Sequence, residues 1–166
     1  MTKKLKLREA LRSQKRGQLG GPYQKLGKYP SNTRCPKCDL FFQDGVWKRG
    51  SSTEVSEQQW KLCPACLQIR EGQVGGIVQF SGTFAGIHRQ ELLNRIRNVE
   101  KLTQEERPLE RIMSLKENSE GIVVAATTEH LVARIGKSIQ RDFGGELDLR
   151  YAPEDKFALV HWHRDA

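Results

Sequence analysis

Two C-x-x-C pairs constrain the fold of this chain more than any other feature. The first pair, CPKC, begins at Cys35, and the second, CPAC, begins at Cys63. Two thiolates spaced by two residues in a tight turn can face one metal ion, and two such turns supply the four sulfurs of a tetrahedral site. Because every ligand is a cysteine, no position is left open for water. The sequence therefore predicts one structural zinc ion, held by Cys35, Cys38, Cys63 and Cys66.

Disulfides and redox motifs are the competing explanations for paired cysteines. Disulfides are typical of secreted proteins, and the basic segment MTKKLKLREALRSQKRG lacks the apolar stretch of a secretion signal. A thioredoxin-like redox pair would occur once, within a βαβ pattern, whereas this motif occurs twice. The longest apolar run, residues 122–126, is too short to cross a bilayer. These features favour a soluble, cytoplasmic zinc protein with no membrane association.

The segments around the cysteines predict a small zinc finger, of the ribbon or treble-clef type, over residues 31–75. Apolar residues flank Asp44-Gly45, a dipeptide typical of two-residue hairpin turns. After the second pair, LQIRE indicates one or two helical turns that stop at Gly72. Zinc would supply much of the folding free energy of so small a domain. We expect its core to contain four aromatic residues: Phe41, Phe42, Trp47 and Trp60.

The remainder of the chain predicts an α+β fold in two parts. Residues 76–107 contain a glycine-flanked strand or extended connector and then an amphipathic helix, with Leu92, Ile96 and Val99 on its apolar stripe. Residues 108–166 follow a ββαββ order, with turn signals between the strands. One helix packed on a four-stranded antiparallel sheet would bury one face of each, which is an α+β sandwich.

Several residues in these elements have distinctive expected environments. His88 lies on the apolar stripe of the first helix, where we expect it to be partly buried and hydrogen-bonded. His161 and His163 share one face of the last strand without an evident third ligand, which favours a solvent-facing pair over a metal site, while Trp162 points to the core. Gly136 inside the second helix permits a close approach of another backbone or of a packed strand. The exposed side of that helix predicts a basic strip: Arg134, Lys137 and Arg141.

Positive charge is concentrated at the N-terminus. The chain has a net charge of +8, and residues 1–34 contain ten Lys or Arg but a single acid. Such a segment cannot bury a core, so we expect a disordered basic arm over residues 1–30 that is attracted to nucleic acid, or else serves as a solubilising tail. Tyr23 and Tyr29 flank lysines and would either stack on unpaired bases or pack under the neighbouring domain. The candidate nucleic-acid-binding residues are Lys3, Lys4, Lys6, Arg8, Arg12, Lys15, Arg16, Tyr23, Lys25, Lys28, Tyr29 and Arg34.

A succession of motifs over residues 31–163 resembles an uncharacterised bacterial zinc-ribbon protein family. The motifs are CPKC, CPAC, SGTFAGIHRQELLNRIRNVE, RPLERIMSL, TTEHLVARIGKSI and GELDLRY. The paired cysteines and TTEHLVARIG resemble, more weakly, the adaptor family that binds the large ribosomal subunit for export in eukaryotes, with its archaeal relatives. That family has more cysteine pairs than the two present here, so its individual ribosome contacts do not transfer. The resemblance implies ribosomal RNA as a partner.

No enzyme signature is visible in the sequence. The segments GIVQFSG and RIGKS lack the spacing of a phosphate-binding loop, and all four cysteines are assigned to the metal. We therefore expect a non-enzymatic protein without a small-molecule substrate. The leading hypothesis is an RNA-binding zinc protein that acts as a ribosome-associated accessory factor, docking on ribosomal RNA and ribosomal proteins in assembly, hibernation or rescue.

Two other functions remain as alternatives. A DNA-binding zinc-finger regulator would use the finger and the arm, although no helix pairs Arg with Asn or Gln at a spacing that faces the groove of a duplex. A protein-interaction adaptor would use the folded modules, and the arm would then be only a tail.

Overall fold

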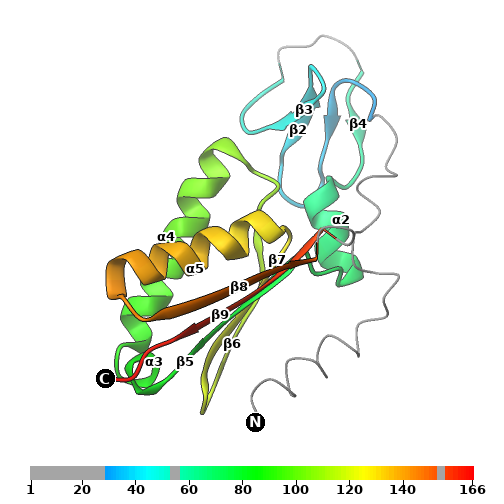
Figure 1. The fold of residues 1–166 in the computed structure, drawn as a ribbon. Helices are drawn as coiled ribbons and strands as arrows, with labels where there is room; N and C mark the ends of the chain where they lie inside the picture. Colours follow the sequence, from blue (N-terminus) through cyan, green and yellow to red (C-terminus); the bar gives the residue numbers. More distant parts are fainter. Residues whose placement is uncertain (1–28, 53–56, 153–155) are drawn as a thin grey trace.

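The computed structural model describes residues 29–52, 57–152 and 156–166, which form two units that lie against each other (Figure 1). The smaller unit is the expected finger, and the larger unit is an α+β domain with helices on one face of a sheet. Of the candidate nucleic-acid-binding residues, Tyr29 and Arg34 lie in the described part. The others fall outside the described residues: Lys3, Lys4, Lys6, Arg8, Arg12, Lys15, Arg16, Tyr23, Lys25 and Lys28.

The finger consists of a four-stranded sheet, in the order β3-β2-β1-β4, and one helix. Strands β2 and β3 form the expected hairpin, in which Asp44 and Gly45 have positive φ angles of 54° and 80°. A turn with two left-handed residues matches the twist of the strands, and Asp-Gly adopts it at low cost. The finger elements are β1 (Thr33–Arg34), β2 (Phe41–Gln43), β3 (Val46–Lys48), β4 (Gln59–Trp60) and α2 (Pro64–Glu71).

The α+β domain is built on a five-stranded sheet in the order β6-β7-β5-β9-β8. All neighbours in it are antiparallel except β5 and β9, which are parallel. The helices α4 and α5 lie side by side on one face of this sheet (Figure 1). The elements are β5 (Gly76–Ser81), α3 (Thr83–Ile87), α4 (Arg89–Glu106), β6 (Ile112–Asn118), β7 (Gly121–Ala126), α5 (Glu129–Phe143), β8 (Glu146–Ala152) and β9 (Phe157–His163).

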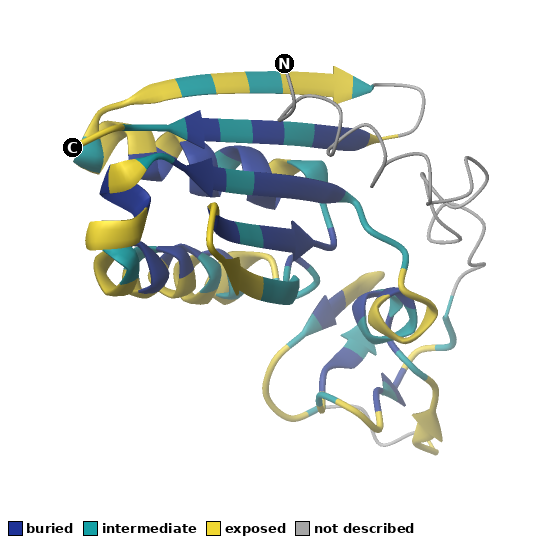
Figure 2. Cartoon of the chain, turned by 90° about the horizontal axis from the view of Figure 1, so that it is seen from below, coloured by how far each residue is buried: buried dark blue, intermediate teal, exposed yellow. Residues whose placement is uncertain are grey.

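The main core lies between the helices and the sheet. Its largest fully buried side chains include Phe80 of β5 and Trp162 of β9, whose rings are 5.9 Å apart, and the stripe Leu131, Ile135 and Ile139 of α5. The expected helix from residue 129 to 143 is confirmed, and Thr128 caps it by accepting a hydrogen bond from the backbone N–H of Leu131. Burial decreases from the inner strands to the edge strand β8, which is more exposed than its neighbour β9 (Figure 2).

The sheet differs from the expected four-stranded antiparallel arrangement. The segment at residues 76–81, expected as a strand or connector outside the ββαββ unit, is the central strand β5, and it joins β7 to β9. Five of its six residues are buried, as expected for a strand at the centre of a sheet with partners on both edges. Its flanking glycines reflect close packing, because a Cβ atom at Gly76 would lie 2.4 Å from a methyl carbon of Val132. The domain boundary expected between residues 107 and 108 therefore falls within one sheet, with β5 before it and β6 to β9 after it.

The first predicted helix is interrupted near its start. The chain forms the short helix α3 and then α4, with His88 between them at φ −102° and ψ 28°. His88 is partly buried, as expected: its ring stacks on Phe84 and its Nδ1 atom lies 2.8 Å from Oε1 of Glu91. The described residues contain no helix with the length and apolarity needed to cross a membrane.

Candidate metal centre

The four cysteine sulfurs converge on one point between the two turns that carry them. All four Sγ atoms lie within 4.8 Å of one another, and those of Cys38 and Cys63 are 3.7 Å apart. A disulfide would require a sulfur–sulfur separation of about 2.05 Å, so the thiols are free. Among the His, Cys, Asp and Glu side chains of the described residues, these four cysteines form the group that lies close enough together to hold a metal ion.

Each cysteine pair is positioned by a different local structure. In the first turn, the N–H of Cys35 donates to the carbonyl of Leu40, and Asp39 adopts the left-handed conformation with φ 60°. In the second, Cys63 is the N-cap of α2, and its Sγ accepts a hydrogen bond from the N–H of Cys66. Helix α2 ends at Gly72, as the sequence predicts. A knuckle and a helix N-terminus thus hold the two pairs facing each other.

The protein environment changes the acidity of these thiols in opposite directions. Burial raises the pKa of Cys63 well above its usual range and also raises that of Cys66. Burial acts in the same sense on Cys35, but hydrogen bonds from backbone N–H groups outweigh it and lower the pKa of this thiol to about 7. Four thiols packed this closely cannot all ionise without a compensating cation, since each new thiolate repels the others. A bound metal ion would supply that compensation.

Arg111 provides a further positive charge directly against the sulfurs. Its Nη1 atom lies 3.2 Å from Sγ of Cys66, and its Nη2 atom lies 3.2 Å from Sγ of Cys38 and 3.8 Å from Sγ of Cys63. Burial disfavours the guanidinium cation, but hydrogen bonds and attraction from Cys38 and the neighbouring sulfurs outweigh it and raise the pKa of Arg111 above its usual value. This residue immediately precedes β6, far from the cysteines in sequence, and no pattern in the chain identified it.

The contact through Arg111 is one part of an interface between the finger and the α+β domain. The side-chain amide of Gln68 in α2 donates a 2.7 Å hydrogen bond to the carbonyl of Thr127, at the end of β7. The hydroxyl of Thr127 accepts a hydrogen bond from the N–H of Arg111 and donates one to the carbonyl of Leu109, both at 2.9 Å. Leu109 also packs against the finger's hydrophobic cluster. The metal centre therefore lies at the junction of the two units.

The finger's aromatic core differs in two positions from the predicted one. Phe41 and Trp47 are buried, and Phe42 packs against the cluster, but Trp60 on the edge strand β4 is 58% exposed, so its predicted burial is wrong. Strand β4 has a single partner, β1, and both its residues are exposed. Tyr29 fills the core instead.

Tyr29 and Arg34 are the two candidate nucleic-acid contacts in the described part of the chain. The Tyr29 ring lies 4.9 Å from that of Trp47, and its hydroxyl donates to the carbonyl of Leu62 at 3.1 Å. Of its two expected roles, packing under the neighbouring domain is the one seen. Arg34 on β1 is partly exposed, with its guanidinium 6.0 Å from the Phe41 ring.

The two histidines of β9 share one face, as predicted, but they are engaged with the sheet rather than turned freely to solvent. Nε2 of His161 and Nδ1 of His163 each lie 3.0 Å from the hydroxyl oxygen of Ser81, which is fully buried. Nε2 of His163 also lies 3.2 Å from a carboxylate oxygen of Asp165. Trp162 points into the core on the other face. Ser81 on β5 was not predicted as their partner, because the pairing of β5 with β9 is not apparent from sequence.

Comparison of the chain with protein-family models, with curated proteins and with solved structures finds no match in any of the three. The assignment of function therefore rests on the residues of this chain.

Proposed function

We propose that the four-cysteine group holds one structural zinc ion. A zinc–sulfur bond of about 2.3 Å implies a tetrahedron with edges of about 3.8 Å between sulfurs. The 3.7 Å separation of the Cys38 and Cys63 sulfurs supports this size. Four thiolate ligands leave no position for water, which favours a structural role over a catalytic one. The knuckle, the hairpin and the helix that carries the second pair support a treble-clef finger rather than a ribbon.

The metal identity is tested on the purified protein. We expect elemental analysis to give about one zinc per chain and a colourless solution, since zinc has no redox chemistry and no visible absorption. Tetrahedral sulfur sites also accept iron, so a coloured protein with stoichiometric iron would contradict the zinc assignment.

We further propose that the protein binds RNA, and that it acts in the cytoplasm as a ribosome-associated accessory factor with ribosomal RNA as its main partner. The observation that carries this proposal is the charge distribution: residues 1–34 contain ten Lys or Arg and one acid, against a nearly neutral remainder. Phosphate neutralisation by such a segment releases counterions and gives strong, salt-dependent affinity. The resemblance to ribosome-binding adaptors favours ribosomal RNA among possible polyanions.

The proposal is tested by recovering the bound nucleic acid. The tagged full-length protein is purified at moderate salt from its own cell extract, and the attached RNA and DNA are sequenced. A variant lacking residues 1–28 is the comparison, because Tyr29 belongs to the finger core and must be kept. We expect ribosomal RNA with the full chain and much less with the shortened one.

A second variant controls for length. Replacing the Lys and Arg residues of positions 1–28 by Gln keeps the arm's size and removes its charge, and we expect the same loss of RNA. Recovery of duplex DNA with one defined sequence would instead support the regulator alternative. Recovery of proteins without nucleic acid would support the adaptor alternative.

A further inference from the structure

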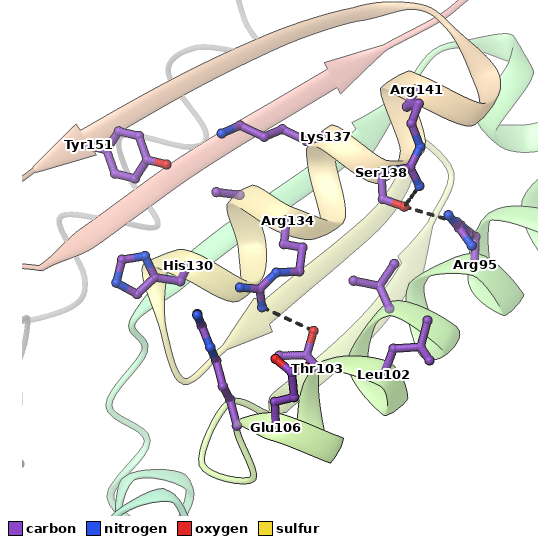
Figure 3. A pocket seen from close by; sticks show the side chains of 13 residues that line it. Arg95, Leu102, Thr103, Glu106, His130, Arg134, Lys137, Ser138, Arg141 and Tyr151 are labelled. Carbon is purple, nitrogen blue, oxygen red and sulfur yellow. Dashed lines mark hydrogen bonds between the residues drawn. The ribbon is translucent and has the colours of Figure 1, made fainter.

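A groove runs between α4 and α5, on the helix-covered side of the α+β domain. Its volume is about 720 Å³, and the edge strand β8 contributes one residue to its rim. Figure 3 shows the side chains of both helices directed into this space. Pockets that hold drug-sized or nucleotide-sized ligands have volumes of this order. The basic strip predicted on α5 forms one of its walls.

The groove lining is strongly basic. It contains a single acid, Glu106, and five permanently charged cations: Arg95, Arg107, Arg134, Lys137 and Arg141. Two acids just outside the lining, Glu110 and Asp142, form ion pairs with several of these cations. The cations exceed these three carboxylates in number, so the groove keeps a positive charge. A concave basic surface of this kind attracts anions.

Four of the five cations have ion-pair partners, and the cations differ in how exposed they are. Arg95 and Arg134 are held in place: Arg95 lies 2.6 Å from Asp142, and Arg134 lies 2.9 Å from Glu110. Lys137 is exposed, and within the part of the chain that the structure describes it has no ion-pair or hydrogen-bond partner. Arg141, one helical turn further along α5, lies 3.1 Å from Asp142 and donates to the Ser138 hydroxyl at 3.3 Å, but its side chain remains 69% exposed. These two cations share a helix face and present their charges to a ligand.

Apolar and aromatic surface accompanies the charge. Tyr151 of β8 is 50% exposed, and Leu102 of α4 is 54% exposed. Figure 3 shows the Lys137 side chain extending toward Tyr151, on the β8 side of α5. An exposed aromatic ring beside cations is the combination by which proteins bind unpaired bases, with the ring stacking on a base and the cations on the phosphates. An acidic peptide would use the cations but would gain little from the ring.

We propose that this groove binds a single-stranded segment of RNA, with backbone phosphates at Lys137 and Arg141 and one base stacked on Tyr151. The inference rests on the proposed RNA-binding function and adds a site on the folded domain to the N-terminal arm. Duplex RNA is a poorer fit, because paired bases are stacked within the helix and cannot reach the tyrosine ring.

The experiment uses the full-length, metal-loaded protein and a fluorescein-labelled oligouridylate of about 12 nucleotides, within the usual site size of single-strand binders. The dissociation constant is measured by fluorescence anisotropy over a range of salt concentrations. The groove variant is Lys137→Gln with Arg141→Gln, which removes two charges without introducing acids. The matched control is Lys116→Gln with Arg150→Gln. These two exposed residues pair in register with Val123 and Leu159, on the opposite face of the sheet.

We expect the groove variant to raise the dissociation constant roughly tenfold near physiological salt and to flatten the salt dependence. Each lost phosphate contact lowers the slope of log affinity against log salt by about 0.7 for a single strand, so two contacts remove about 1.4. Tyr151→Phe should bind like the unsubstituted protein. Tyr151→Ala should weaken binding roughly tenfold and leave the slope unchanged, because stacking involves no counterions.

Different failures separate the two proposals. If the unsubstituted full chain does not bind the oligonucleotide, both the RNA-binding function and the groove are refuted. If it binds but the groove variant matches the control, only the groove is refuted. A groove variant that loses binding of a poly-glutamate peptide while keeping RNA affinity would also overturn the proposal, since the groove would then be a site for acidic protein.

Discussion

Replacing Arg111 by Met should weaken both the metal centre and the docking of the finger. Methionine keeps most of the side-chain volume but has neither charge nor hydrogen-bond donors. In the structure, the guanidinium donates to the sulfurs of Cys66 and Cys38 at 3.2 Å each and lies close to a third at 3.8 Å. It also donates from Nε to the carbonyl of Pro108 at 2.9 Å. The substitution removes all of these contacts at once.

The magnitude follows from the number and charge of the contacts. A hydrogen bond to a charged group contributes about 1.5–3 kcal/mol, so the two short sulfur contacts together correspond to a loss of about 3–6 kcal/mol. In a chain of this size, each kcal/mol lowers the melting temperature by about 2–4 °C, so we expect a fall of roughly 10 °C. Removal of a group that hydrogen-bonds to metal ligands lowers metal affinity by about 10- to 100-fold.

Thermal unfolding and competition with a zinc chelator measure the two effects. Arg150→Met is the control, because Arg150 is exposed on β8 and its pairing with Asp148 should contribute less than about 1 kcal/mol. Arg111→Lys should fall between the two, since a lysine cannot span two sulfurs with one planar group. If Arg111→Met matches Arg150→Met in both stability and zinc affinity, the interpretation of this contact is refuted.

Three other changes test separate parts of the fold. Cys63→Ser should reduce bound zinc from about one per chain to a small fraction and unfold the finger, as elemental analysis and a melting curve would show; a variant with full zinc content would contradict the ligand assignment. Gly136→Ala should destabilise the protein by about 1 kcal/mol in chemical unfolding, because its Cβ would lie 2.6 Å from a methyl carbon of Val160 and the packing cost exceeds the gain in helix propensity. Gly86→Ala is its control and should be neutral or stabilising, since that Cβ meets nothing within 4 Å. The pKa of Asp165 is lowered by the hydrogen bond from the Thr83 N–H and by His163, so its stabilising effect is present above the usual carboxyl pKa and disappears as pH falls through the lowered value. The difference in melting temperature between the native protein and Asp165→Asn should accordingly be present at neutral pH and vanish in strong acid.

Local patterns in the sequence predicted most of the individual elements. The hairpin at Asp44-Gly45, the end of α2 at Gly72 and the bounds of α5 follow from turn, cap and periodicity signals that act within a few residues. The place of β5 in the sheet could not be predicted in this way. It pairs with β7 and β9, both far along the chain, and parallel pairing leaves no turn signature in the sequence.

In the metal centre, too, the sequence predicted the residues set by local geometry and missed those set by contacts between distant segments. Spacing alone identified the four ligands, because a C-x-x-C turn places two sulfurs on one side by local geometry. Arg111 was not identified, since its role depends on the docking of two units and not on any motif around it. Trp60 was placed in the core by its type, although its strand lies at the edge of a small sheet where one face stays exposed.

The loop between α4 and β6 connects the metal centre to the groove. Arg107 lines the groove, and Glu110 holds Arg134 in its wall at 2.9 Å. Leu109 packs against the finger, and Arg111 donates to the cysteine sulfurs. Alternate residues of one short segment thus contact the two sites.

A loosened metal centre should therefore weaken RNA binding at the groove. Without its contacts to the sulfurs, the loop loses one of its anchors, and the ion pair between Glu110 and Arg134 loses its fixed position. We expect Arg111→Met to raise the dissociation constant for the single-stranded oligonucleotide severalfold beyond Arg150→Met, which removes the same charge from the other side of the sheet. Equal dissociation constants for these two variants would show that the finger and the groove bind independently, with the loop serving only to join them.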